Sequence, residues 1–137
     1  MNNKFRPWII FLSAFGLLIT LIVVINEFRT PGFCPCYPLL NVPACYMVSV
    51  FFTVVLGSQF IKDARTSSVI FFSGTIVGLV TAIWFSTKQI LGTGLCPILF
   101  GIPIPLCYVA FFVFVALLLL QFKGRVAADS SNLESSV

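Results

Sequence analysis

The residues of this sequence best suited to chemistry are its cysteines, and four of the 5 lie in two copies of one pattern. The first copy runs from Gly32 to Tyr46, and the second runs from Gly94 to Tyr108, which is 62 positions later. Both copies read Gly-x-Cys-Pro, then seven residues, then Pro-x-Cys-Tyr. Paired thiols can close disulfides, exchange them with other thiols, or bind a soft metal ion. The special chemistry of the chain is therefore predicted to be sulfur chemistry.

The two cysteines within each copy occupy different positions. Cys45 and Cys107 each follow a proline by two residues, and a proline in that place is typical of the start of a helix. Free N–H groups and the helix dipole favour a thiolate there. Cys34 and Cys96 lie earlier, in the predicted loops. The candidate disulfides Cys34–Cys45 and Cys96–Cys107 would each close a ring of about a dozen residues and stabilise the fold by roughly 3 kcal/mol. Four cysteines can pair in more than one way, however, and the sequence leaves the pairing open.

Cys36 has no counterpart in the second copy, where Ile98 takes its place. It is either a structural or incidental residue of a proline-rich loop, or a mobile thiol that makes the first pair part of an exchange relay. Because Cys34 and Cys36 are too close in sequence for an unstrained bond, Cys36 could attack a Cys34 disulfide only after the loop moves. All the cysteines are therefore candidate redox residues, and a purely structural role for the pairs is the alternative.

The composition predicts that these cysteines belong to an integral membrane protein. Hydrophobic residues make up 59% of the 137 residues and charged residues 9%, whereas charged residues make up about 25% of soluble domains. Four apolar stretches long enough to cross a bilayer follow one another: Trp8 to about Ile25, Ala44 to Ile61, Val69 to Thr87, and Pro105 to Phe122. We expect an all-α membrane protein whose four transmembrane helices form a single domain, residues 1–125. A disordered cytoplasmic tail, residues 126–137, is expected to follow.

The 62-residue offset extends beyond the cysteines. It pairs Gly16 with Gly78, Leu17 with Leu79, Phe52 with Phe114, and Gln59-Phe60 with Gln121-Phe122. We therefore expect two tandem two-helix repeats, at about residues 8–61 and 70–123. Because each repeat crosses the membrane twice, the copies share one orientation, and a pseudo-twofold axis along the membrane normal should relate them. This arrangement places the two cysteine loops side by side.

Gly74 and Gly78 are separated by three residues within the third apolar stretch. This spacing lets two membrane helices approach closely, but glycine is also frequent in membrane helices in general. The sequence does not decide between these interpretations.

The lysines and arginines predict the orientation of the chain in the membrane. Only Arg29 and Lys88 fall on one side of a four-helix zigzag. The other side carries the remaining six: Lys4, Arg6, Lys62, Arg65, Lys123 and Arg125. The side with more positive charge is predicted to be cytoplasmic. A multi-pass protein with both termini in the cytoplasm is expected, and its cysteine loops then face the extracytoplasmic space, which is oxidising in most cells.

This topology resembles a known class of redox proteins. Four helices, both termini inside, and cysteine pairs in or beside the two outer loops are similar to the disulfide bond formation protein B family and, more loosely, to the vitamin K epoxide reductase family. Those families carry a Cys-x-x-Cys pair at a helix start, and the nearest equivalents here are Cys34-Pro35-Cys36 and the helix-start Cys45. The resemblance implies a membrane thiol–disulfide oxidoreductase or redox partner. Its electron acceptor would be a quinone bound between the helices near Arg29 or Lys88.

Other chemistries lack the residues that they need. The chain has no histidine and no glycine-rich phosphate loop, so we expect no metal cofactor, no nucleotide site and no nucleic-acid partner. The expected partners are the lipid bilayer and either a thiol protein or other membrane subunits. The alternative function is non-enzymatic: a small repeat transporter or channel, or an accessory subunit, whose loop disulfides are structural. The equivalence of the two loops favours this alternative, because a relay needs two cysteine pairs of different reduction potential.

Overall fold

The computed structural model describes residues 4–32, 34, 36, 39–93, 101 and 104–136. Four α-helices account for most of these residues: α1 (Arg6–Arg29), α2 (Ala44–Ser58), α3 (Ala64–Ile90) and α4 (Leu106–Ser135). No β-strand forms within the described part of the chain. The predicted all-α fold class is confirmed.

Three of the helices are long and apolar enough to span a membrane. These are α1, α3 and α4, which contain 24, 27 and 30 residues. The apolar helix α2 has 15 residues, or about 22 Å of helix, whereas the hydrocarbon core of a bilayer is about 30 Å thick. By length and composition, three of the four expected spans are present, and α2 is shorter than predicted.

The outer surface of the bundle is strongly apolar. Several large hydrophobic side chains on α1, α3 and α4 are 58–68% exposed: Trp8, Phe11, Leu18, Val80, Phe112 and Leu119. So many exposed large hydrophobic side chains are unusual for a soluble monomer of this size. Such a surface is expected of helices that face lipid.

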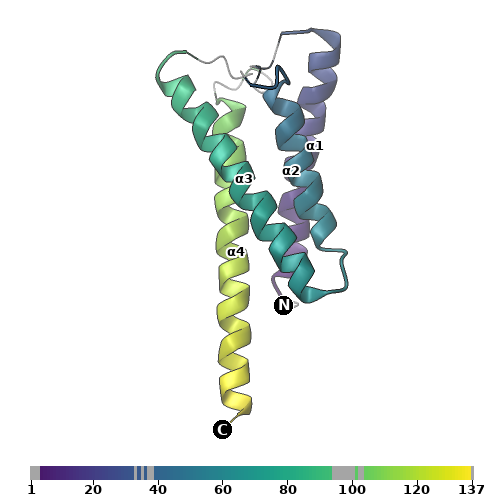
Figure 1. The fold of residues 1–137 in the computed structure, drawn as a ribbon, viewed down its shortest axis with the longest axis vertical. Helices are drawn as coiled ribbons and strands as arrows, with labels where there is room; N and C mark the ends of the chain where they lie inside the picture. Colours follow the sequence, from purple (N-terminus) through teal and green to yellow (C-terminus); the bar gives the residue numbers. More distant parts are fainter. Residues whose placement is uncertain are drawn as a thin grey trace.

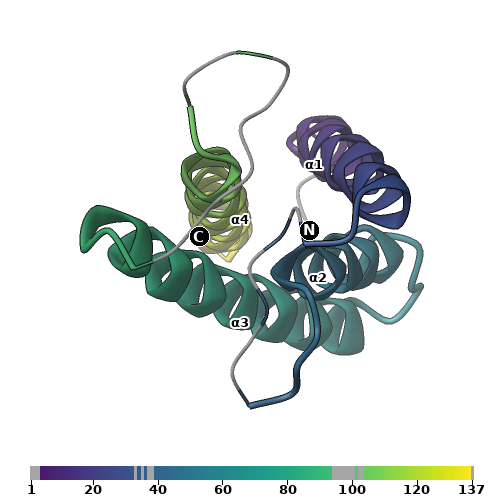
Figure 2. The ribbon, with the colours of Figure 1, turned by 90° about the horizontal axis from the view of Figure 1, so that it is seen from above.

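The helices form one bundle in which neighbours in the chain lie side by side (Figures 1 and 2). α1 packs against α2, α2 against α3 and α3 against α4, while a smaller contact between α1 and α4 closes the ring. The end of α1, the start of α2, the end of α3 and the start of α4 share one end of the bundle (Figure 1). The start of α1 and the end of α4 lie toward the opposite end, where α4 extends beyond the other helices (Figure 1). The topology therefore places Cys34, Cys45 and Cys107 at the same end.

Two phenylalanines and two glycines make the closest contacts in the core. Phe52 of α2 stacks on Phe114 of α4, with ring centroids 4.6 Å apart, and both rings are buried. A Cβ atom added to Gly16 would lie 2.5 Å from the Phe52 ring, and one added to Gly78 would lie 2.6 Å from the Phe114 ring. α1 and α3 can approach the stacked rings this closely only because these positions are glycine.

Gly74 also lies at a helix contact, since a Cβ atom there would be 3.3 Å from side chains of Val54 and Val55 in α2. Gly78 faces Phe114 from the same helix. Each glycine of the pair therefore allows close packing, but Gly74 meets α2 and Gly78 meets α4, so the spacing does not form one contact face for a single neighbouring helix.

Several helix ends differ from those expected. α1 continues past Ile25 to Arg29, because polar residues end an apolar span without ending the helix, and α3 likewise extends beyond its expected stretch at both ends. α2 ends at Ser58, short of Ile61. The carbonyl of Ser58 accepts the hydroxyl of Ser67 at 2.6 Å. The same carbonyl also accepts the N–H of Ile61 at 3.3 Å, so groups beyond the helix satisfy it.

The segment after Arg125 is helical in place of the disordered tail expected from the sequence. α4 passes through Gly124 and continues to Ser135. A single glycine inside a helix costs only about 1 kcal/mol relative to alanine, and residues 126–135 contain neither glycine nor proline. The hydroxyl of Ser130 also donates to the carbonyl of Val126 at 3.0 Å, within the helix. The sequence thus lacks a residue that stops the helix earlier.

Candidate functional site

The first cysteine loop contains a buried disulfide between Cys34 and Cys45. The Cα atoms are 6.4 Å apart, and the two residues are separated by 11 positions. Only 4% of Cys34 and 9% of Cys45 is exposed. Both pack in a hydrophobic cluster with Val23, Val24 and Leu106. The first expected pairing is confirmed, and it ties the loop to the start of α2.

The start of α2 gives Cys45 the position that the sequence predicts. Pro43 precedes the helix, and its carbonyl accepts the N–H of Tyr46 at 3.1 Å. Cys45 therefore lies in the first turn, and its own carbonyl accepts the hydroxyl of Ser49 at 2.9 Å. The first turn of α2 contains no acidic residue. The positive end of the helix dipole is available to stabilise a Cys45 thiolate when the disulfide opens.

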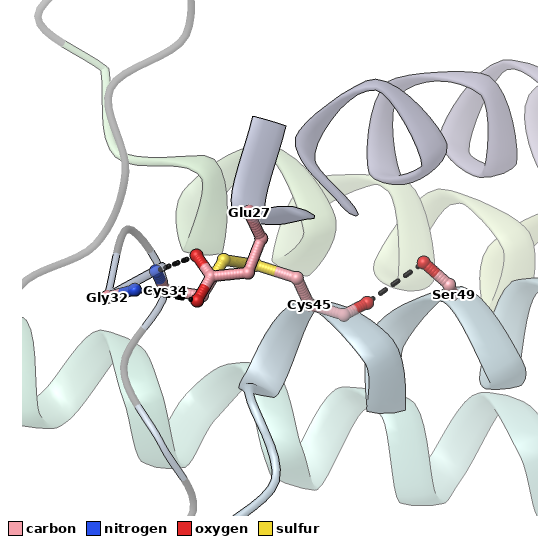
Figure 3. Close-up of a disulfide and its surroundings, with 5 residues drawn as sticks. All are labelled: Glu27, Gly32, Cys34, Cys45 and Ser49. Atoms are coloured by element: carbon pink, nitrogen blue, oxygen red, sulfur yellow. Dashed lines mark hydrogen bonds between the residues drawn. A yellow bond between two sulfur atoms is a disulfide. The ribbon is translucent and has the colours of Figure 1, made fainter. Parts of the chain in front are cut away.

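A buried carboxylate lies beside this disulfide (Figure 3). Glu27, near the end of α1, is 8% exposed. Its Oε2 accepts the N–H of Cys34 at 2.8 Å, and its Oε1 accepts the N–H of Gly32 at 3.0 Å. Figure 3 shows these two bonds holding the loop segment of Cys34 against the end of α1. Gly32 has a φ of 96°, a conformation that favours glycine and lets the chain turn back toward Glu27.

The sequence patterns did not single out Glu27, which lies just after the first apolar stretch. Its position could have indicated a role, because an acidic residue directly before a cysteine loop can accept hydrogen bonds from backbone N–H groups of that loop. The signal is weak, since most such residues face solvent.

Cys36 is a free and exposed thiol. It forms an isolated antiparallel bridge with Pro43, so the loop folds back over the residues that lead into α2. A free thiol therefore lies on the surface of the same loop that holds the buried disulfide. Thiols outside the protein reach Cys36 more readily than they reach Cys34 or Cys45.

The second cysteine pattern begins its helix in the same way as the first. The carbonyl of Pro105 accepts the N–H of Tyr108 at 3.0 Å. Cys107 is the second residue of α4 and is disulfide-bonded. Cys96 lies outside the described residues, so the expected Cys96–Cys107 pairing stays a prediction.

Cys45 and Cys107 line the same small apolar cavity, which has a volume of about 40 Å³ and lies where the four helices meet. Each helix contributes two or three lining residues: Thr20, Val23, Ala44, Cys45, Val48, Ala82, Phe85, Leu106, Cys107 and Ala110. These residues form five pairs whose members are 62 positions apart in the sequence. The cavity holds little more than one or two water-sized groups. It brings the two helix-start cysteines to one place without room for a larger molecule between them.

The positive residues expected near an electron acceptor lie away from this cavity. Arg29 is exposed at the end of α1, and the Nζ of Lys88 lies 5.5 Å from the centroid of the Trp84 ring. Neither residue lines the cavity. Among the described residues, no group of three or more His, Cys, Asp or Glu side chains could hold a metal ion.

Comparisons of the chain with models of known protein families, with curated proteins and with solved structures found no match. The similarity to quinone-linked thiol oxidoreductases therefore stays a hypothesis based on topology, and the function is inferred from the site.

Proposed function

We propose that the protein is a multi-pass membrane thiol–disulfide oxidoreductase, or the redox partner of one, that acts through its loop cysteines. The observation that carries this proposal is the cavity that both Cys45 and Cys107 line. Each of these cysteines belongs to the first turn of its helix, where the dipole favours a thiolate. A thiolate on Cys45 is then near the disulfide of Cys107, which is the arrangement that exchange requires.

Disulfide exchange between the two cysteine pairs conserves bonds, electrons and protons without a further reactant. When the Cys34–Cys45 pair is reduced, the Cys45 thiolate attacks the sulfur of Cys107. A Cys45–Cys107 bond forms, and the former partner sulfur of Cys107 leaves as a thiolate. Cys34 then loses its proton and attacks Cys45, which restores the Cys34–Cys45 bond and releases Cys107 as a thiolate. Two electrons pass to the second pair, which also takes up the two protons that the first pair lost.

Cys36 is the proposed entry point for electrons. It is free and exposed, and after a movement of the loop its thiolate can attack Cys34 and release Cys45. The resulting Cys34–Cys36 bond is strained and easily reduced, and the dithiol of a partner protein would reduce it. The resemblance in topology suggests a quinone as the final acceptor, bound outside the 40 Å³ cavity.

The proposed architecture has four membrane crossings in two tandem repeats of shared orientation. The cavity supports this proposal, because its lining residues pair at the same 62-residue offset as the cysteine patterns. In the proposed orientation both termini are cytoplasmic and the cysteine loops are extracytoplasmic, as the lysines and arginines favour. The short helix α2 would cross with local thinning of the bilayer or with help from its flanking residues.

A second candidate is a non-enzymatic membrane protein whose disulfides only hold its loops, such as a small transporter or a subunit of a larger complex. The burial of the first disulfide favours this candidate, since 4% of Cys34 and 9% of Cys45 is exposed. Buried structural disulfides resist cellular thiols.

Trapping of mixed disulfides in native membranes tests the proposal. Cells that express the full chain are quenched with acid, free thiols are alkylated, and disulfide-linked partners are identified by mass spectrometry. We expect Cys36 in a mixed disulfide with another thiol protein, and we expect the Cys36→Ser protein to lose both that adduct and its redox activity. The opposite result is a fully active Cys36→Ser protein that traps no partner and keeps the disulfides of Cys34–Cys45 and Cys107 closed in every state. That result would exclude the oxidoreductase and support the non-enzymatic candidate, in which the disulfides are structural.

A further inference from the structure

Glu27 makes the two cysteine loops chemically different. Its buried carboxylate accepts the N–H groups of Cys34 and Gly32 at 2.8 and 3.0 Å. The residue 62 positions later is Gln89, whose side chain is a neutral amide. An acidic group therefore lies next to the first disulfide (Figure 3), and the equivalent sequence position of the second repeat carries no charge.

The charge matters because a disulfide can open in two ways. An attacking thiolate bonds to one sulfur and expels the other, and the sulfur that carries negative charge more easily leaves faster. Cys45 is favoured as the leaving sulfur, since it lies in the first turn of α2 and no acidic residue shares that turn. A thiolate on Cys34 is disfavoured by the neighbouring carboxylate, because like charges repel.

We infer that Glu27 directs attack on the first disulfide to the sulfur of Cys34, so that Cys45 is the sulfur released. In this step the attacking thiolate forms a mixed disulfide with Cys34, the Cys34–Cys45 bond breaks, and Cys45 keeps the electron pair as a thiolate. The inference deepens and rests on the proposed function, because the released Cys45 is the residue that shares a cavity with Cys107. Glu27 bonds to the backbone N–H of Cys34, so it is a positioning residue.

Mapping the mixed disulfide tests this selectivity directly. Full-length Cys36→Ser protein in detergent micelles is treated briefly with 2-mercaptoethanol, a small neutral thiol, and quenched with acid. Peptide mass spectrometry then measures the ratio of adduct on Cys34 to adduct on Cys45. We expect the adduct mainly on Cys34. In the Glu27→Gln protein the ratio should fall about threefold or more, because a shift of one unit in thiol acidity changes exchange rates about threefold.

Two controls separate charge from loosening of the loop. Glu27→Asp keeps the negative charge but shortens the side chain, so it should keep the preference for Cys34 even if the hydrogen bonds to the loop weaken. Gln89→Glu changes the equivalent residue of the second repeat and should leave the Cys34 to Cys45 ratio unchanged. A second measurement uses Cys45→Ser protein, in which iodoacetamide should alkylate Cys34 severalfold faster at pH 8 when Glu27 is replaced by glutamine.

Several results would overturn the inference: an adduct mainly on Cys45, an unchanged ratio in Glu27→Gln, a Glu27→Asp protein that behaves like Glu27→Gln, or no adduct at all. The same spectra report whether a Cys45–Cys107 disulfide forms after the first disulfide opens, because the adduct on Cys34 blocks the step that would release Cys107. If the adduct forms on Cys34 as expected but Cys45 does not become linked to Cys107, the selectivity stands and the proposed relay fails. The two failures are therefore distinguishable.

Discussion

The rings of Phe52 and Phe114 stack with their centroids 4.6 Å apart and their planes 10° apart. Each ring also packs directly against a glycine of a neighbouring helix, which is Gly16 for Phe52 and Gly78 for Phe114. The two glycine contacts are 62 positions apart in the sequence. One packing arrangement therefore occurs twice, on either side of the stacked pair, and the two copies should respond alike to the same substitution.

Gly16→Ala and Gly78→Ala are each expected to lower the free energy of unfolding by about 1–3 kcal/mol, the usual cost of an extra methyl group in a packed core. The new Cβ atoms would lie 2.5 and 2.6 Å from the rings, so the two losses should be similar. Denaturant unfolding in mixed micelles measures both. Gly57→Ala is the matched control, because nothing lies within 4 Å of its added Cβ atom. If Gly57→Ala lowered the free energy of unfolding equally, contact with the phenylalanine rings would not be the cause of the loss.

Replacing Cys34 and Cys45 together by alanine is expected to lower the free energy of unfolding by about 3 kcal/mol, because the unfolded chain gains the freedom of an opened ring. Cys36→Ser should change it by less than about 0.5 kcal/mol, since Cys36 is free and exposed. The same micelle assay compares the two proteins. A Cys36→Ser protein as unstable as the one without the disulfide would mean that Cys36 holds the loop.

Asp63 caps the start of α3, and its carboxylate accepts the hydroxyl and the N–H of Thr66. These bonds, the hydroxyl first, hold the pKa of Asp63 below its usual value. Because the pKa is lower in the folded state, the stabilisation is complete above the unfolded pKa of about 3.9 and disappears as the pH falls through the folded pKa. Asp63→Asn should therefore lower Tm more at pH 7 than at pH 3. Equal changes in Tm at the two pH values would show that the charge of Asp63 does not matter.

The orientation of the chain is tested by reporters at four points. Reporters at Asp63 and in the C-terminal tail should be cytoplasmic, and those at Leu40 and Gly101 should be extracytoplasmic, because most of the positive charge lies on the first side. Alkaline phosphatase fusions are active only on the extracytoplasmic side and β-galactosidase fusions only on the cytoplasmic side, so the two give complementary signals. A reporter at Asp63 on the outside would contradict the orientation and, with it, the oxidising surroundings of the cysteines.

Much of the architecture could be predicted from local sequence. Apolar runs predict the helices, and proline followed two residues later by cysteine predicts Cys45 in a first turn, which α2 confirms. The offset of Gly16 and Gly78 also marks the two places where a helix meets a phenylalanine ring. These features depend on neighbours in the chain or on direct comparison of the two halves.

The remaining features depend on how the chain returns on itself. The role of Glu27 appears only once the loop brings the N–H of Cys34 to its carboxylate. The carbonyl of Ser58 at the end of α2 likewise accepts a hydroxyl of Ser67 from the next helix. A pattern of apolar and polar residues does not record contacts between distant segments. The pattern therefore predicts where the cysteine pairs lie, but it does not predict that an acidic side chain lies beside one of them.

Cys45 and Cys107 should form a disulfide with each other when their own partners are removed. A full-length protein in which Cys34, Cys36 and Cys96 are serine keeps only these two cysteines, and both line the 40 Å³ cavity. Mild oxidation in micelles should then give an intramolecular Cys45–Cys107 bond, identified by mass spectrometry of the linked peptides. This bond is the intermediate that exchange between the two pairs requires.

The matched control for this cross-link keeps Cys36 and Cys107 as the two cysteines. Cys36 is exposed and is not among the residues that line the cavity, so its bond with Cys107 should form much more slowly. Circular dichroism of both proteins confirms that the helices are retained. If the folded protein with Cys45 and Cys107 failed to cross-link faster than the control, direct exchange between the loops would be excluded, because the two thiols would not meet even without competing partners. The disulfides would then act as separate structural links at the ends of two helix pairs.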